Sequence, residues 1–143
     1  MLFRSWAAEQ SGQIDAMRAW AAAKAGTEPY VLMGDMNTGP VLPNIEGEEP
    51  ANFTRLATGL RDVQSEQGEA RCSFCKENPL VPDTAPSVLI DHMLFGNFPS
   101  ASLHADRILD QAITVTVDTR KETTAYSDHY GLMISVSEIH TQP

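Results

Sequence analysis

Three short polar clusters stand in a fixed order along this chain, each at or next to the end of an apolar run. They occupy residues 34–37 (Gly-Asp-Met-Asn), 90–92 (Ile-Asp-His) and 127–129 (Ser-Asp-His). The neighbouring runs have the length and apolar content typical of strands. Carboxylates, an amide and a histidine at strand ends are groups that a divalent metal ion and a phosphate ester require. We therefore expect a fold that gathers these clusters at one end of a sheet.

The first part of the chain predicts a helix followed by a strand. Residues 5–25 carry apolar side chains at three- and four-residue spacing, and Gly26 is a natural stop. The tryptophan and methionine stripe of this helix, which includes Trp6 and Trp20, is interpreted as core packing. Residues 30–33 form a short apolar strand, and we expect it to be buried on both faces.

The middle of the chain is predicted to be mainly loop. Residues 38–50 contain several glycines and prolines and cannot form a regular element. Asn52 is expected to cap a short helix whose apolar side begins at Phe53. Residues 62–86 form a long polar loop, and loops of this length are often functional or mobile.

The second half of the chain alternates in the manner of strands. Strands are predicted at 88–95, 113–117 and 132–136, with a polar connection at 119–126. We expect the strands at 88–95 and 132–136 to share one sheet with the strand at 30–33, with the N-terminal helix packed on that sheet. The predicted fold class is α/β (α+β), in layers of helix and sheet.

The composition is that of a soluble globular protein. The chain has 143 residues, 42% of them apolar and 20% charged, and a formal net charge of −9. The acidic balance argues against passive binding to nucleic acid, because like charges repel. No apolar run is long enough for a transmembrane helix, and no signal peptide is visible, which leaves the compartment open.

Two cysteines, Cys72 and Cys75, lie three residues apart within the long loop. A structural zinc site needs four ligands, and no histidine pair stands at a suitable spacing near them. A redox-active pair needs the start of a helix after a strand, and the surroundings predict a loop instead. A local disulfide and two free loop cysteines both remain open.

The first polar cluster has two interpretations. Asp35 and Asn37 stand two residues apart, so in an extended chain their side chains project to the same side. Together they could position a water molecule and hold a phosphate oxygen. The alternative is an Asx turn that closes the strand.

The other two clusters place histidines beside carboxylates. Asp91 follows apolar residues and would need a partner if buried, such as a histidine that it orients. His92 points to the opposite side of the strand and is interpreted as structural. Asp128 is a candidate metal ligand and His129 a candidate acid or base. Ser127 is expected to satisfy backbone groups at the turn, not to act as a nucleophile.

Taken together, the clusters resemble the endonuclease/exonuclease/phosphatase (DNase I-like) superfamily. Members show a GDxN motif after a central strand, then an apolar strand ending in Ile-Asp or Leu-Asp, then Ser-Asp-His before the last strand. This chain has the three motifs in that order, at 34–37, 90–91 and 127–129. Gln13 on the upstream helix fits as well, since members often carry a glutamine there. The likeness extends over most of the chain and implies a DNase I-like layered sandwich.

The resemblance implies a role for each motif residue in the hydrolysis of a phosphoester. Asp35 would position or activate the attacking water, and Asn37 would contact the scissile phosphate. Asp91 would orient His129, which would hydrogen-bond the phosphate or transfer a proton. Asp128 would belong to the metal site, which in this family holds Mg²⁺ or another divalent cation.

The resemblance also implies that residues 1–143 are a partial domain, the C-terminal half of a member. The N-terminal half of the family supplies the principal metal-binding glutamate, so we expect weak or no hydrolysis by this chain alone. The parent function is a metal-dependent phosphodiesterase or phosphatase of undetermined substrate. The alternative is a non-catalytic binding or assembly module that self-associates through an incomplete core.

Overall fold

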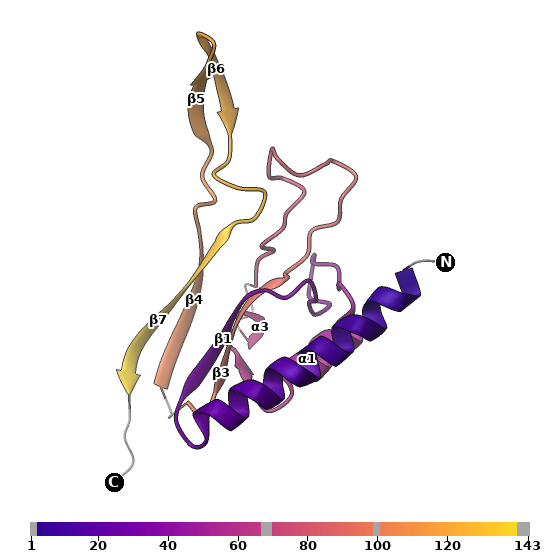
Figure 1. Ribbon diagram of the computed structural model, residues 1–143. Helices are drawn as coiled ribbons and strands as arrows, with labels where there is room; N and C mark the ends of the chain where they lie inside the picture. The colour runs from indigo at the N-terminus through magenta and orange to yellow at the C-terminus, as the bar shows by residue number, and fades with distance from the viewer. Residues whose placement is uncertain (1–2, 67–69, 99–100, 140–143) are drawn as a thin grey trace.

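A computed structural model describes residues 3–66, 70–98 and 101–139, and it contains both helices and small antiparallel sheets (Figure 1). The elements, in chain order, are α1 (Phe3–Ala25), β1 (Tyr30–Asp35), α2 (Pro50–Ala57), β2 (Arg61–Asp62), α3 (Val63–Glu66), β3 (Asp91–Gly96), β4 (Ala101–Ile108), β5 (Ile113–Val117), β6 (Arg120–Thr124) and β7 (Gly131–Ile139). The architecture is α+β, as the sequence predicts at the level of fold class.

The helix α1 forms where the sequence predicts it, but only part of the predicted stripe lies in the core: Met17 packs against the core, whereas the two tryptophans do not. Gly26 adopts a positive φ of 58° directly after the helix, a conformation that glycine tolerates best. Trp6 and Trp20 are 46% and 65% exposed, so the prediction that they pack in the core is wrong. The helix instead buries Gln10 and Ile14, because this is the side that contacts α2 and β1.

One sheet carries the strands that hold the first two polar clusters. Its order is β1-β3-β2, antiparallel throughout, and the register places Asp35 opposite Asp91. The strand β1 lies at the edge of this sheet, and Met33 is 66% exposed. The prediction that β1 is buried on both faces is wrong, because no residue of β1 is fully buried and Met33 is largely exposed.

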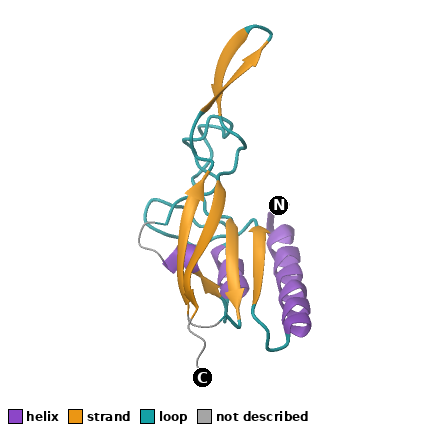
Figure 2. Cartoon of the chain, turned by 90° about the vertical axis from the view of Figure 1, so that its left-hand side faces the viewer, coloured by secondary structure: helices purple, strands orange, loops and turns teal. Residues whose placement is uncertain are grey.

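The remaining strands form two separate two-stranded sheets, β4-β7 and β5-β6. The prediction that the last strand joins β1 and β3 in one sheet is therefore wrong, because β7 pairs with β4 instead. The segment at 119–126 is not a simple connection either, since β6 returns along β5 as a hairpin. In Figures 1 and 2 this hairpin extends away from the rest of the molecule.

Two loop predictions need correction. The segment at 62–86 begins with structure, because β2 pairs with β3 and is followed directly by α3. Asn52 does not cap α2, whose N-cap is Glu49 with Pro50 in the first turn. Asn52 lies inside the helix, where its amide donates to the Ala7 carbonyl and to Gln10 Oε1. A buried polar side chain with partners is stable within a helix even when its type favours caps.

Among the described residues, two hydrophobic clusters form much of the core, and each includes a residue in or just before β3. One joins α1, α2 and β3 through Ile14, Leu56 and Leu94. The other packs Leu89, which precedes β3, against Cys75 and Tyr130. Within the described residues, no helix is both long and apolar enough to cross a membrane.

Candidate functional site

The residue pair Asp91 and His129 forms the centre of the candidate site. Asp91 is the first residue of β3, and His129 lies just before β7. The His129 Nδ1–H donates to Asp91 Oδ2 over 2.7 Å. Both side chains are partly buried, with 21% and 26% of their surfaces exposed. The structure thus brings together two residues that lie 38 positions apart in the sequence.

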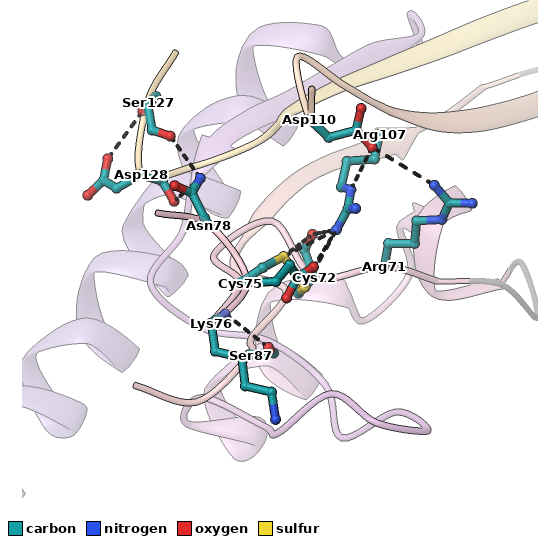
Figure 3. Close-up of polar contacts among 11 residues, drawn as sticks. Arg71, Cys72, Cys75, Lys76, Asn78, Ser87, Arg107, Asp110, Ser127 and Asp128 are labelled. Carbon is teal, nitrogen blue, oxygen red and sulfur yellow. Dashed lines mark hydrogen bonds and ion pairs between the residues drawn. A yellow bond between two sulfur atoms is a disulfide. The ribbon is translucent and has the colours of Figure 1, made fainter. Parts of the chain in front are cut away.

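A tight turn and a neighbouring aromatic ring hold His129 in place. Its backbone N–H donates to Ser127 Oγ, so Ser127 satisfies the turn as predicted. The Phe74 ring lies against the imidazole, with 5.2 Å between ring centroids. Asn78 Nδ2 donates to the carbonyls of Ser127 and Asp128, as Figure 3 shows. The turn is therefore fixed from outside by the segment that contains Phe74 and Asn78.

Burial and acidic neighbours shift the pKa of His129 in opposite directions. Burial of the ring lowers the pKa of His129, but the hydrogen bond to Asp91 and the negative charges of Asp91, Asp35 and Asp128 raise it. The net pKa of His129 lies above its ordinary value of 6.5. Because Nδ1 is bonded to Asp91, Nε2 is the nitrogen left to meet a substrate, and no described residue hydrogen-bonds to it.

The first polar cluster forms an Asx turn beside this pair. Asp35 Oδ1 accepts from the Asn37 backbone N–H over 2.8 Å, and Asn37 has a positive φ of 47°. The alternative interpretation of this cluster is thus what the structure contains. It leaves the site intact, because Asp35 remains opposite Asp91 across the two strands and its charge acts on His129.

Gln10 of α1 supports the Asx turn. This side chain is buried, and its Nε2 donates to the carbonyls of Met36 and Asn37, over 3.1 and 2.8 Å. Gln13, the glutamine to which the resemblance points, is exposed. Both glutamines line a concave surface next to Asp35 and Asn37, of about 280 Å³. Gln10 follows the three- and four-residue spacing predicted for this helix, but the sequence did not indicate that it supports this turn.

His92 faces the other side of β3 and is fully buried, as expected for a structural residue. Its Nε2 lies 2.9 Å from the Thr38 carbonyl, and its Nδ1 lies 3.3 Å from Asp62 Oδ2. The Phe53 ring packs against it, 4.8 Å between centroids. This second histidine–aspartate pair therefore belongs to the core.

The candidate carboxylates do not gather into a ready-made metal site. Among the described residues, the only group with three His, Cys, Asp or Glu ligand atoms within 4.8 Å of one another is Cys72, Cys75 and Glu77. Hard divalent cations take six or more oxygen ligands, several from water. Asp128 is exposed and offers a single carboxylate. These residues alone therefore do not fit a magnesium site.

Cys72 and Cys75 form a disulfide, so of the two alternatives that the sequence left open, the local disulfide is correct. Arg107 of β4 lies over this bridge, with its Nη1 at 3.3 Å from Cys75 Sγ and also from Glu77 Oε1 (Figure 3). A guanidinium so close to the sulfur atoms repels cations. The bridge is accordingly a structural element and a poor place for a metal ion.

The sequence comparisons with known proteins provide no evidence on the function of this chain. No protein-family model matches this chain, and no curated protein matches it in sequence. The site is therefore defined by geometry alone: a histidine–aspartate pair, an Asx turn beside it, and a concave surface next to that turn.

Proposed function

We propose that this chain carries catalytic residues of a metal-dependent phosphoester hydrolase. The single observation that carries the proposal is the 2.7 Å hydrogen bond between His129 Nδ1 and Asp91 Oδ2, made by two of the three motifs that resemble the superfamily. A carboxylate that holds one imidazole nitrogen directs the other nitrogen to a substrate. The ordered motifs add support, because each of them lies in or next to this site.

In the proposed reaction, His129 acts on the phosphoester through Nε2. The Asp91 carboxylate holds the proton on Nδ1 and stabilises the imidazolium. With its raised pKa, His129 carries a proton on Nε2 over a wider range of pH than a free histidine does. That proton can hydrogen-bond a phosphate oxygen or pass to the leaving oxygen.

Asp35 and Asn37 are the proposed water-positioning and phosphate-binding residues. Asp35 lies on the strand next to Asp91, and its charge acts on His129, so the two side chains face the same region. Asn37 has its backbone fixed by Gln10 and by Asp35, while its side chain is exposed. An amide on a fixed backbone is suited to orient a phosphate oxygen.

The divalent cation remains part of the proposal, with Asp128 as one expected ligand. Three carboxylates surround His129, and the chain has a net charge of −9, so a phosphate group is repelled unless a cation compensates. Further oxygen ligands have to come from outside the described cluster, for example from water and from the substrate phosphate. The cation would supply charge neutralisation.

The non-catalytic assembly module is the second candidate function, and the edge of the first sheet favours it. The strand β1 pairs only with β3 within the described chain, and Met33 on β1 is largely exposed. An open strand edge with apolar side chains is a template for pairing with another chain. This candidate requires association without any role for His129.

The test is hydrolysis of bis-(p-nitrophenyl) phosphate by the purified chain, with Mg²⁺ and with EDTA. We expect slow, Mg²⁺-dependent release of p-nitrophenol that His129→Ala removes. His104→Ala is the matched control, since His104 is an exposed histidine on β4. Turnover that is equal in His129→Ala contradicts the proposal. Absence of both turnover and any change in the His129 NMR signals on adding the diester favours the assembly module.

A further inference from the structure

We propose that Ser73, inside the loop closed by Cys72 and Cys75, is the residue that positions Asp91 against His129. Ser73 is completely buried. Its Oγ accepts hydrogen bonds from the backbone N–H groups of Ile90 and Asp91, each over 3.1 Å. One hydroxyl thereby fixes the backbone at the residue that carries the catalytic carboxylate.

The backbone of Ser73 makes the corresponding contact on the histidine side. Its carbonyl accepts from the Tyr130 N–H over 2.8 Å, and Tyr130 directly follows His129. Its own N–H donates to the Val88 carbonyl over 3.0 Å. Ser73 is therefore bonded both to the segment that leads to Asp91 and to the residue after His129.

This double attachment matters because the two strands concerned belong to different sheets. The strands β3 and β7 are not neighbours in any sheet of the described chain. Phe74, the next residue after Ser73, forms isolated antiparallel bridges with both Val88 and His129. The segment at 73–74 thus acts as a short strand between the two halves of the site, and a shift of this segment separates Asp91 from His129.

The side-chain chemistry explains why a serine suits this position. Two backbone N–H groups need one acceptor in a place with no solvent, and a buried donor without an acceptor destabilises the fold. Alanine removes the acceptor but fits the space. Threonine keeps the hydroxyl and adds a methyl group, so it should restore part of the function.

The disulfide limits the movement of this segment. Cys72 and Cys75 flank Ser73 and Phe74, and both cysteines are buried. Arg107 of β4 contacts Cys75 Sγ and the Cys72 carbonyl, and stacks over the Tyr130 ring at 4.5 Å from its centroid. The loop is therefore held at its ends by a covalent bond and by the sheet that contains β7. Because its loop is held in this way, Ser73 can fix the positions of both Asp91 and His129.

The experiment compares Ser73→Ala and Ser73→Thr with the unchanged chain by two readouts. The first is the nitrogen-15 NMR spectrum of the His129 ring at a pH where the ring is neutral, since the ring shifts report which nitrogen carries the proton. The bond to Asp91 favours the proton on Nδ1. We expect Ser73→Ala to increase the form protonated on Nε2, and Ser73→Thr to restore the original population in part. This readout does not depend on the proposed function.

The second readout is turnover of bis-(p-nitrophenyl) phosphate, which does rest on the proposed function. We expect Ser73→Ala to lower kcat by about 10-fold to 100-fold with little change in KM, as for a small misplacement of a catalytic group. If the hydrolase proposal fails, no variant shows turnover, but the tautomer shift is still observed. The two failures are thereby distinguishable.

Two controls separate positioning from a general loss of stability. Ser87→Ala removes a hydroxyl that also accepts a backbone N–H, from Lys76, without touching either partner of the pair (Figure 3). Val63→Ala destabilises a buried site on α3. Neither should move the His129 tautomer or the kcat of the folded fraction. A Ser73→Ala chain with an unchanged tautomer, or Val63→Ala with the same tautomer shift, overturns the assignment of Ser73.

Discussion

The strand β3 carries two histidine–aspartate pairs, one on each side, and they differ mainly in burial. Asp91 and His129 lie 2.7 Å apart with about a fifth to a quarter of each side chain exposed. His92 and Asp62 lie 3.3 Å apart with 0% and 6% exposed. The alternation of a strand puts the neighbours Asp91 and His92 on opposite faces, so one sequence step separates the two environments.

Burial distinguishes the pair that we propose to act on a substrate from the pair that belongs to the core. The imidazole of His129 has Nδ1 engaged by Asp91, no described hydrogen-bond partner at Nε2 and 26% of its side chain exposed, so it can meet a substrate. The imidazole of His92 has the Thr38 carbonyl at Nε2 and Phe53 on its face, while its buried Nδ1 lies 3.3 Å from Asp62 Oδ2 without a hydrogen bond. A group that is enclosed on every side cannot reach a phosphate. We therefore expect variants of the first pair to affect turnover and variants of the second to affect stability.

The largest expected effect is on turnover at the exposed pair. His129→Ala should lower the hydrolysis rate by roughly 10²- to 10⁴-fold, the usual contribution of a general acid or base. Asp91→Asn should have a smaller effect in the same direction, because His129 keeps its Nε2 but loses its orientation. Rates with bis-(p-nitrophenyl) phosphate measure both variants.

The free energy of unfolding is the control for this prediction. Both His129→Ala and Asp91→Asn should leave the urea midpoint close to that of the unchanged chain, because partly exposed pairs contribute little to stability. If these variants lose activity only in proportion to a loss of stability, the exposed pair acts through stability as the buried pair does, and the prediction is wrong.

The next largest effect is on stability at the buried pair. His92→Leu removes one neighbour of Asp62 and leaves a carboxylate in the core, whose Oδ2 keeps the hydrogen bond from Ser65 Oγ and whose Oδ1 has no hydrogen-bond partner in the described structure. We expect unfolding to become easier by about 3–5 kcal/mol. Urea denaturation monitored by far-UV circular dichroism measures the change.

The double variant His92→Leu with Asp62→Leu sharpens the argument. An apolar pair of suitable volume often replaces a buried ion pair without loss of stability. Recovery of most of the lost stability in the double variant indicates that the uncompensated carboxylate was the cause. An equal loss in the single and double variants would point to a cavity instead.

The sequence predicts the contact within the exposed pair but not the sheet arrangement around it. Hydrophobic periodicity is a local signal, and it correctly indicates α1, β1, β3 and β7, whereas the proximity of Asp91 to His129 was implied by the family resemblance of the three clusters. Strand pairing is a long-range choice. The strand β4 has weak alternation of apolar and polar residues around His104 and Asp106. The sequence therefore did not predict this strand or its pairing with β7.

The supporting residues of the site were also missed, for a physical reason. Ser73, Asn78 and Gln10 act by hydrogen bonds to backbone groups far away in the sequence. Such contacts depend on where the backbone passes, not on the type of side chain. A polar residue type alone predicts solvent exposure, and only the fold reveals that these three are buried.

A third prediction tests whether the exposed pair depends on its neighbouring turn. Gln10→Ala leaves the carbonyls of Met36 and Asn37 without a donor in a partly buried place. We expect a loss of about 1–3 kcal/mol in stability and a drop in turnover, because the turn that carries Asp35 and Asn37 loosens. Urea denaturation and the diesterase assay measure the two changes.

Gln13→Ala is the matched control on the same helix. Gln13 is exposed, so its removal should change stability by no more than about 0.5 kcal/mol. Equal losses in Gln10→Ala and Gln13→Ala would contradict support of the turn by Gln10, since alanine is the better helix former and its propensity cannot cause a loss.

The smallest expected effect is the pH dependence of stability due to His129. Its pKa is raised in the folded protein by Asp91, Asp35 and Asp128, in excess of the lowering by burial. A raised folded pKa means that the folded state binds the proton more tightly than the unfolded state does. The resulting stabilisation is fully present below the unfolded value of 6.5 and is lost as the pH rises through the higher folded value. Urea denaturation between about pH 5 and pH 8, compared with His129→Gln, isolates this share, since the buried pair of His92 is common to both chains. The stability advantage of the unchanged chain over His129→Gln should shrink as the pH rises. An advantage that grows with pH would mean that burial lowers the pKa of His129 by more than the three carboxylates raise it.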